Sequence, residues 1–138
     1  PKSVRSARTG SFPNSIREYL EQNNYGAAIE TVDRWEDQFA TEKVKGHTFF
    51  WRGLALGLRG QQREASEYLD LALNLGEGAV WENQARWRLA MALEATGRAG
   101  RARTELAKLV SIGIRDQWTE LARKKLKTSA GAKKGKTP

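Results

Sequence analysis

The sequence contains no cysteine, only three prolines and a single histidine. The absence of cysteine excludes a disulfide framework, so the hydrophobic core has to provide the stability of the fold. One histidine without a cysteine forms neither a typical metal-ligand set nor a Cys–His pair for nucleophilic catalysis. We therefore expect no metal, no cofactor and no enzymatic activity.

Long apolar runs are missing as well. No stretch approaches the roughly 20 apolar residues that a membrane-spanning helix needs, and the N-terminal region lacks the apolar segment of a signal peptide. The lack of cysteine suits a reducing compartment. These features predict a cytoplasmic protein without a membrane span. The 138 residues, of which 39% are hydrophobic, are enough for one domain with a sizeable core.

The net charge of +8 is concentrated at the two ends of the chain. Residues 1–8 hold three basic side chains and residues 123–138 hold seven, whereas all 16 acidic residues lie between them. The middle of the chain is therefore close to neutral. We expect a basic flexible segment at 1–11, a folded domain at 12–126 and a basic tail at 127–138. The tail should be disordered, because it has no apolar side chain larger than alanine.

The sequence repeats with a period of 37 residues. In this register Ala28, Ala65 and Ala102 coincide, and Gly60 coincides with Gly97. Other matching positions are Leu56 with Leu93, Leu69 with Leu106 and Trp81 with Trp118. Apolar residues three or four apart in each unit indicate two amphipathic helices. The pattern predicts helices at 13–23, 26–39, 46–59, 62–75, 79–96, 99–111 and 115–126.

Each unit contains a turn signal and a small residue at fixed positions. Gly60 and Gly97 stand where the first helix of a pair has to end, because glycine adopts the left-handed conformation without strain. Asn23 and Asn24 take this position in the first unit. The three repeated alanines fall one turn into the second helices. There, a missing side chain allows the paired helix to approach closely.

The order of these positions resembles the tetratricopeptide repeat. The second unit matches the family pattern at Gly53, Leu56, Gly60, Ala65, Leu69, Ala72 and Leu73. The third unit matches it at Ala90, Leu93, Gly97, Ala102 and Leu106. The first unit matches it more faintly, at Tyr19, Tyr25, Ala28 and Val32. The resemblance covers about residues 12–126. The period departs from the ~34 residues of the family, and Arg52 stands at a position that is usually apolar.

The resemblance implies an all-α fold, a right-handed α-solenoid of three helix-turn-helix repeats closed by a C-terminal capping helix. A repeat unit cannot cover its own apolar faces, so the stack needs caps. Trp118 and Ala122 repeat the spacing of Trp81 and Ala85. The final helix therefore corresponds to a first helix that lacks a second helix to pair with.

In the tetratricopeptide family the first helices line an inner face that receives a peptide. The resemblance places at this face Arg17, His47, Phe50, Leu54, Gln84, Trp87, Met91 and Lys124. The lysine clamp with which some members hold a C-terminal carboxylate is not matched, because Phe50 and Trp87 stand at those positions. The alternative is that the aromatic side chains pack between neighbouring first helices. The resemblance implies a non-enzymatic scaffold for a protein or peptide partner.

Two other functions are compatible with the sequence. The basic tail, with Lys127, Lys133, Lys134 and Lys136, can neutralise phosphates, as in an RNA-, DNA- or ribosome-associated component. Such binding would weaken steeply with salt. Alternatively, the tryptophan-rich faces are permanent interfaces of a structural subunit in a larger assembly.

The repeat assignment predicts which alanines tolerate enlargement. Ala65→Leu or Ala102→Leu should lower the free energy of unfolding by about 1–3 kcal/mol, because both residues are expected at helix crossings. Ala130→Leu, in the expected tail, should leave it nearly unchanged. Urea unfolding followed by circular dichroism measures the difference, and equal midpoints for the three variants would contradict the assignment.

Overall fold

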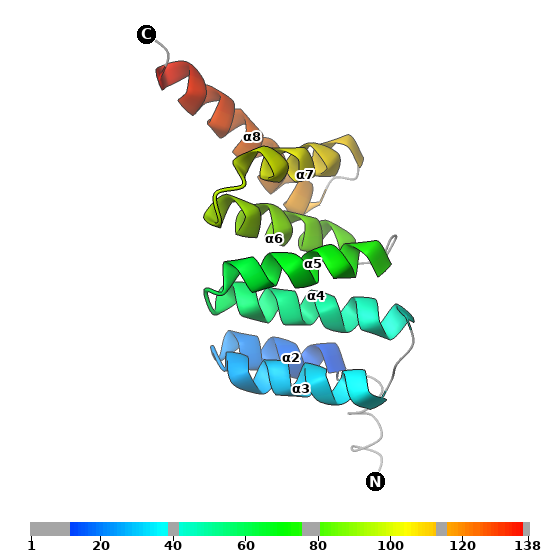
Figure 1. The fold of residues 1–138 in the computed structure, drawn as a ribbon. Coiled ribbons are helices and arrows are strands. Elements are labelled where there is room, and N and C mark those ends of the chain that lie inside the picture. Colours follow the sequence, from blue (N-terminus) through cyan, green and yellow to red (C-terminus); the bar gives the residue numbers. More distant parts are fainter. Residues whose placement is uncertain (1–11, 39–41, 76–80, 113–115, 137–138) are drawn as a thin grey trace.

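The computed structural model describes residues 12–38, 42–75, 81–112 and 116–136, and within these ranges its only regular secondary structure is α-helix (Figure 1). The helices are α2 (Phe12–Glu21), α3 (Tyr25–Gln38), α4 (Glu42–Leu58), α5 (Gln62–Leu75), α6 (Glu82–Ala95), α7 (Ala99–Ile112) and α8 (Gln117–Lys136). The predicted all-α class is confirmed. None of these helices is both long and apolar enough to cross a membrane.

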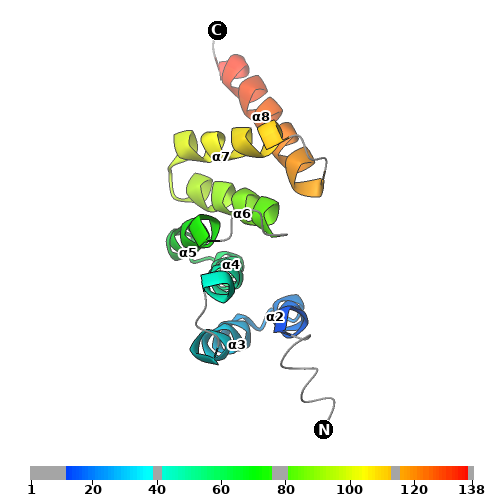
Figure 2. The same ribbon diagram turned by 90° about the vertical axis from the view of Figure 1, so that its right-hand side faces the viewer.

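The helices follow one another as a stack of pairs. Figures 1 and 2 show the pairs α2–α3, α4–α5 and α6–α7 in succession, with α8 at the opposite end from α2. Each helix contacts the next one along the chain, and α6 also contacts α4 and α8. Neighbouring elements in the sequence are therefore neighbours in space, as expected of a repeat-like helical arrangement.

Two helices are longer than the sequence pattern predicted. Helix α4 begins at Glu42 instead of residue 46, so Gly46 lies inside the helix and not at its start. Helix α8 continues to Lys136 instead of ending at residue 126, so most of the expected disordered tail is helical. Lysine and alanine are good helix formers, and basic side chains are favourable near a helix C-terminus. The expected flexible segment 1–11 lies outside the described residues.

The first helices of all three pairs end in the same left-handed turn. Asn23, Gly60 and Gly97, spaced 37 residues apart in the sequence, have φ angles of 59°, 96° and 80°. The next backbone N–H donates to the carbonyl five residues earlier in each turn, from Asn24 to Tyr19 at 2.7 Å, from Gln61 to Leu56 at 2.9 Å and from Arg98 to Leu93 at 2.8 Å. This is the Schellman pattern, which satisfies carbonyls at the helix end. The 37-residue period therefore recurs in the backbone hydrogen bonds.

The repeated alanines lie at the centre of the pairs. Ala28, Ala65 and Ala102 are fully or almost fully buried, as predicted. They belong to a core that runs through the whole stack, from Ile16 in α2 to Ala122 in α8, with Ala65 in a smaller adjoining cluster. Small side chains at these positions allow close packing, and a larger one would have to displace its neighbours.

The start of α8 is anchored to α6 by Asp116. The Asp116 carboxylate accepts hydrogen bonds from the Thr119 backbone N–H at 2.9 Å and from the Asn83 side chain at 2.9 Å. The Asp116 backbone N–H in turn donates to Thr119 Oγ1 at 3.0 Å. Burial acts to raise the pKa of Asp116, but these hydrogen bonds outweigh it and lower the pKa. Asp116 thus caps α8 and fixes its position on the stack.

The left-handed turns predict opposite effects for two glycine substitutions. Gly97→Ala should lower the free energy of unfolding by about 1–2 kcal/mol, because alanine is strained at positive φ. Gly100→Ala is the matched control, since Gly100 is helical and its added Cβ would meet no atom within 4 Å. It should raise the free energy by up to about 1 kcal/mol. Thermal unfolding of both variants measures the effects, and a stabilising Gly97→Ala would refute the turn geometry.

Candidate functional site

We call the side of the first helices that the resemblance assigns to partner binding the first-helix face. On α6 this face carries a strip of four partly exposed residues at helical spacing, Gln84, Trp87, Arg88 and Met91. The other side of α6 is buried in the core through Ala85, Leu89 and Leu93. Trp87 and Met91 pack against this core without being enclosed by it. Three of the predicted partner-binding side chains, Gln84, Trp87 and Met91, therefore remain partly accessible on α6.

A small recess lies where this strip meets α4 and α5. Its volume is about 70 Å³. It is lined by Gly53, Leu54, Gly57, Leu58, Gln62, Ala65, Leu69, Arg88 and Met91, and we refer to it as the Arg88 recess. Leu58, at its edge, is 41% exposed. The structure thus brings the predicted residues Leu54 and Met91 together, beside two others that the sequence pattern did not single out, Leu58 and Arg88.

The burial of Phe50 and Leu54 contradicts the expectation that these residues line an open groove. Phe50 is 1% exposed and Leu54 is 5% exposed, so neither presents much surface to a partner. The Phe50 ring stacks on Trp81 with centroids 5.1 Å apart and meets Trp51 edge-on at 5.1 Å. His47 lies 6.0 Å from Trp81 in the same cluster. At this level of the stack, the aromatic residues pack between first helices, which is the alternative that the sequence left open.

The remaining predicted site residues are dispersed. Arg17 on α2 and Lys124 on α8 are exposed, and neither lines the Arg88 recess. Lys127 is also exposed on α8, whereas the side chains of Lys133, Lys134 and Lys136 lie outside the described part of the chain. The structure therefore does not join the eight predicted positions into one continuous groove.

Arg88 has an unusual environment for a partly buried arginine. Within the part of the chain that the structure describes, its Nε is buried without a hydrogen-bond partner. Its guanidinium carbon lies 5.9 Å from the centroid of the Trp118 ring on α8. Burial lowers the pKa of Arg88, because desolvation disfavours the charged form. Among the described residues, the contact found for the Arg88 guanidinium is the ring of Trp118.

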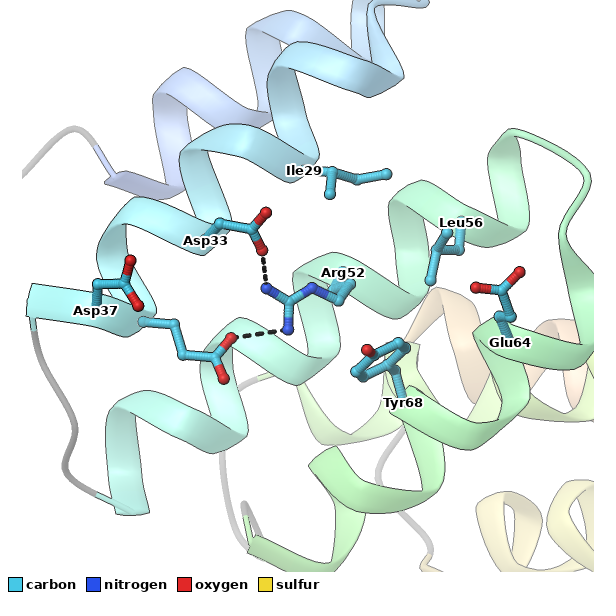
Figure 3. Close-up of a pocket in the computed structure, with 8 residues that line it drawn as sticks. Ile29, Asp33, Asp37, Arg52, Leu56, Glu64 and Tyr68 are labelled. Atoms are coloured by element: carbon cyan, nitrogen blue, oxygen red, sulfur yellow. Dashed lines mark hydrogen bonds and ion pairs between the residues drawn. The ribbon is translucent and has the colours of Figure 1, made fainter.

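A larger cleft lies between α3, α4 and α5 (Figure 3). Its volume is about 590 Å³, and it is lined by Ile29, Asp33, Glu36, Asp37, Arg52, Leu56, Glu64 and Tyr68. We call it the Arg52 cleft. Figure 3 shows Arg52 reaching from α4 towards carboxylates on α3, with the ring of Tyr68 on its other side. None of these residues belonged to the predicted site.

Arg52 is firmly held in this cleft. Its side chain is 11% exposed and forms ion pairs with Asp33 and with Glu36, the latter at 2.7 Å, and its guanidinium lies 5.2 Å from the Tyr68 centroid. Desolvation acts to lower the pKa of Arg52, but hydrogen bonds and charge interactions with Glu36 and Asp33 outweigh it and raise the pKa. The cleft is lined by four acidic side chains, those of Asp33, Glu36, Asp37 and Glu64, against the single cation of Arg52, so its net charge is negative.

The sequence contained a partial signal for this cleft. Arg52 departs from the apolar residue of the repeat pattern, and Asp33, Glu36 and Asp37 recur at helical spacing on α3. Such spacing is also typical of a solvated helix face. Only the packing of α3 against α4 shows that the arginine and the acids meet. No cluster of histidine, cysteine or acidic side chains in the described ranges could hold a metal ion.

The Arg52 ion pairs predict a specific stability loss. Replacing both acids, Asp33→Asn with Glu36→Gln, should lower the free energy of unfolding by about 1–3 kcal/mol, because a largely buried cation would lose its compensating charges. Asp37→Asn is the matched control in the same cleft and should change it by less than about 0.5 kcal/mol. Denaturant unfolding at low and high salt measures both, and equal effects of the two changes would show that the pairs contribute nothing specific.

The chain matches no protein-family model, no curated protein and no solved structure in comparisons with known proteins. The tetratricopeptide resemblance therefore rests on the sequence pattern. The features of the described structure that bear on function are the Arg88 recess, the Arg52 cleft and the basic helix α8.

Proposed function

We propose that the protein is a non-enzymatic, tetratricopeptide-like interaction module that holds a segment of a protein partner on its first-helix face, at the Arg88 recess. One observation carries the proposal. Apolar side chains from two successive first helices, Leu58 on α4 and Trp87 and Met91 on α6, remain incompletely buried beside the recess. In a protein without a binding partner at this face, burying these side chains would increase the stability of the fold.

The energetics of such a face favour binding of an apolar side chain. Covering an apolar side chain such as Leu58 or Met91 is worth up to roughly 1.5–3 kcal/mol. Trp87 is the residue type that most often dominates an interface, since it offers a large contact area with little conformational freedom to lose. The recess lies between packed helices of the core, so little ordering is required on binding. These features support a preformed docking face.

The basic helix α8 supports a rival function in nucleic-acid binding. Arg123, Lys124, Lys125 and Lys127 follow one another closely on α8, which extends away from the stack (Figure 1). Lys125 is paired with Glu94 at 3.1 Å and Arg123 with Glu120 at 2.9 Å, which reduces the free positive charge. The absence of aromatic residues after Trp118 also removes platforms for base stacking from most of α8. We therefore favour a protein partner.

The two functions predict opposite results for two variants. For a partner isolated by cross-linking and then purified, Trp87→Ala should weaken binding by about 2 kcal/mol or more, as truncation of an aromatic anchor does. Deletion of residues 128–138 should have little effect at physiological salt. Leu71→Ala is the matched control, because Leu71 is an exposed apolar residue on α5, a second helix, and so is not part of the first-helix face. Isothermal titration calorimetry gives the affinities.

Thermal unfolding of the same samples has to show that Trp87→Ala is folded. If affinity survives Trp87→Ala and disappears with the deletion, the first-helix face is not the binding site. A nucleic-acid partner would also show a steep decrease of affinity with salt, with about 0.7–0.9 in log–log slope for each neutralised phosphate. A shallow salt dependence together with loss in Trp87→Ala is the result expected for the proposed face.

A further inference from the structure

We propose that the Arg52 cleft is a docking site for basic side chains of helix α8 from a second copy of this chain, so that copies associate head to tail. The cleft supplies carboxylates and α8 supplies lysine ammonium groups, and the contact is non-covalent. It is separate from the proposed function, because the Arg52 cleft and the Arg88 recess share no lining residue.

The cleft contains two carboxylates that its own arginine does not bind. Asp33 and Glu36 pair with Arg52. Asp37 and Glu64, by contrast, are exposed and form no ion pair within the described part of the chain. Figure 3 shows these two residues on opposite sides of Arg52, Asp37 on α3 and Glu64 on α5. A cation that enters the cleft therefore meets acceptors on both of its walls.

The equivalent interface one repeat further along the stack is bridged by an ion pair. In the 37-residue register, Asp33 corresponds to Asp70 and Glu64 corresponds to Arg101. Asp70 on α5 pairs with Arg101 on α7, so opposite charges join two successive second helices. Between α3 and α5 both positions are acidic, and the same bridge cannot form. A cation from outside would take the part that Arg101 has in the other interface.

The shape and lining of the cleft suit lysine side chains. Its volume of about 590 Å³ accommodates long side chains, and Ile29, Leu56 and Tyr68 line it together with the acids. The four-carbon stem of a lysine packs along such apolar groups while its ammonium reaches the carboxylates. The ammonium is a point charge on a flexible stem, so it pairs with acids at different depths of the cleft.

The two ends of the stack carry opposite charges. Residues 12–38, which form α2 and α3, include six acidic and two basic residues, whereas residues 117–136, which form α8, include one acidic and seven basic residues. Lys124 and Lys127 are exposed on α8 and form no ion pair with any described residue. They are three residues apart and therefore share one face of the helix. Helix α8 thus presents the cations that complement the cleft.

The contact has to join two copies, because α8 and the cleft lie far apart in one copy. Helix α8 packs on α6 and α7, and Figures 1 and 2 show it at the opposite end of the stack from α3. Figure 1 also shows its C-terminal part extending away from the stack. Each contact leaves one cleft and one α8 unused, so further copies can be added.

Sedimentation velocity of the full chain tests the association. At about 50 mM salt the protein should form assemblies that grow with concentration, and at about 500 mM salt these should dissociate, because salt screens exposed charges. The cleft variant, Asp37→Lys with Glu64→Lys, should raise the dissociation constant at least about 10-fold. The α8 variant, Lys124→Glu with Lys127→Glu, should have an effect of the same size.

A matched control separates the cleft from the net charge of the chain. Glu18→Lys with Glu67→Lys changes the net charge by the same amount as the cleft variant, but these exposed residues on α2 and α5 do not line the cleft. The dissociation constant should change by less than about 2-fold. Trp87→Ala should assemble like the unaltered protein, so a failure of the proposed function and a failure of this contact are distinguishable.

Mixing the two variants tests which surfaces meet. The cleft variant retains an intact α8, and the α8 variant retains an intact cleft. Each should be monomeric alone, and the mixture should form a 1:1 dimer that does not grow, because only one productive contact remains. A chain that carries both charge reversals should associate again, since the exchanged charges still attract.

Glu64→Arg separates docking from folding. This change gives the first interface the residue that Arg101 provides in the second. An arginine at position 64 should pair with a carboxylate of α3 in the same chain, which keeps the thermal midpoint and weakens association at least about 10-fold. Circular dichroism and thermal unfolding of every variant show that loss of association does not come from loss of structure.

Several results would overturn the proposal. The first is an unaltered protein that stays monomeric at low salt and high concentration. The second is association that the folded cleft and α8 variants leave unchanged, and the third is a mixture of the two variants that stays monomeric. Loss of association on deletion of residues 1–11, with no effect of the α8 variant, would assign the cations to that segment and reject α8. Assembly of the unaltered protein that stops at a dimer would show a symmetric contact instead of a head-to-tail one.

Discussion

The left-handed turn between the two helices of each pair is the constraint on which the stack depends. At Asn23, Gly60 and Gly97 the chain reverses within a few residues, and the same Schellman hydrogen bonds are formed each time. This turn sets where the second helix starts and therefore where its buried alanine meets the first helix. Since three pairs share this geometry, their apolar faces are presented in the same way, and stacking them produces one core.

Equivalent turns do not make equivalent interfaces. Between the first two pairs, Arg52 is clamped by acids of α3 and leaves a cleft with excess negative charge. Between α4 and α6, Phe50 and Trp81 fill the interface with stacked rings. Between α6 and α8, Arg88 and Trp118 meet without an acid. The repeat thus provides one scaffold, while the residues that vary within it produce three chemically different surfaces.

The sequence pattern was most reliable where local geometry decides the structure. A glycine at a helix end or an alanine at a crossing has one physical reason to be there, and the expected turns and buried alanines were confirmed. It was less reliable at α4, which passes through Gly46, and at α8, which continues to Lys136. Helix propensity is a weak guide in such segments, because the gain or loss per residue is small beside the effect of neighbouring structure.

The sequence by itself determined the helical class, the 37-residue period, the turns between paired helices and the alanines at their crossings. These follow from spacing and from the backbone freedom of single residues. Tertiary structure decided which aromatic residues are core and which remain accessible, because Phe50 and Trp87 occupy equivalent repeat positions and differ in their neighbours. It also decided that Arg52 finds two carboxylates, whereas Arg88 finds none among the residues that the structure describes. Such differences depend on contacts between residues distant in sequence, which a periodic pattern does not encode.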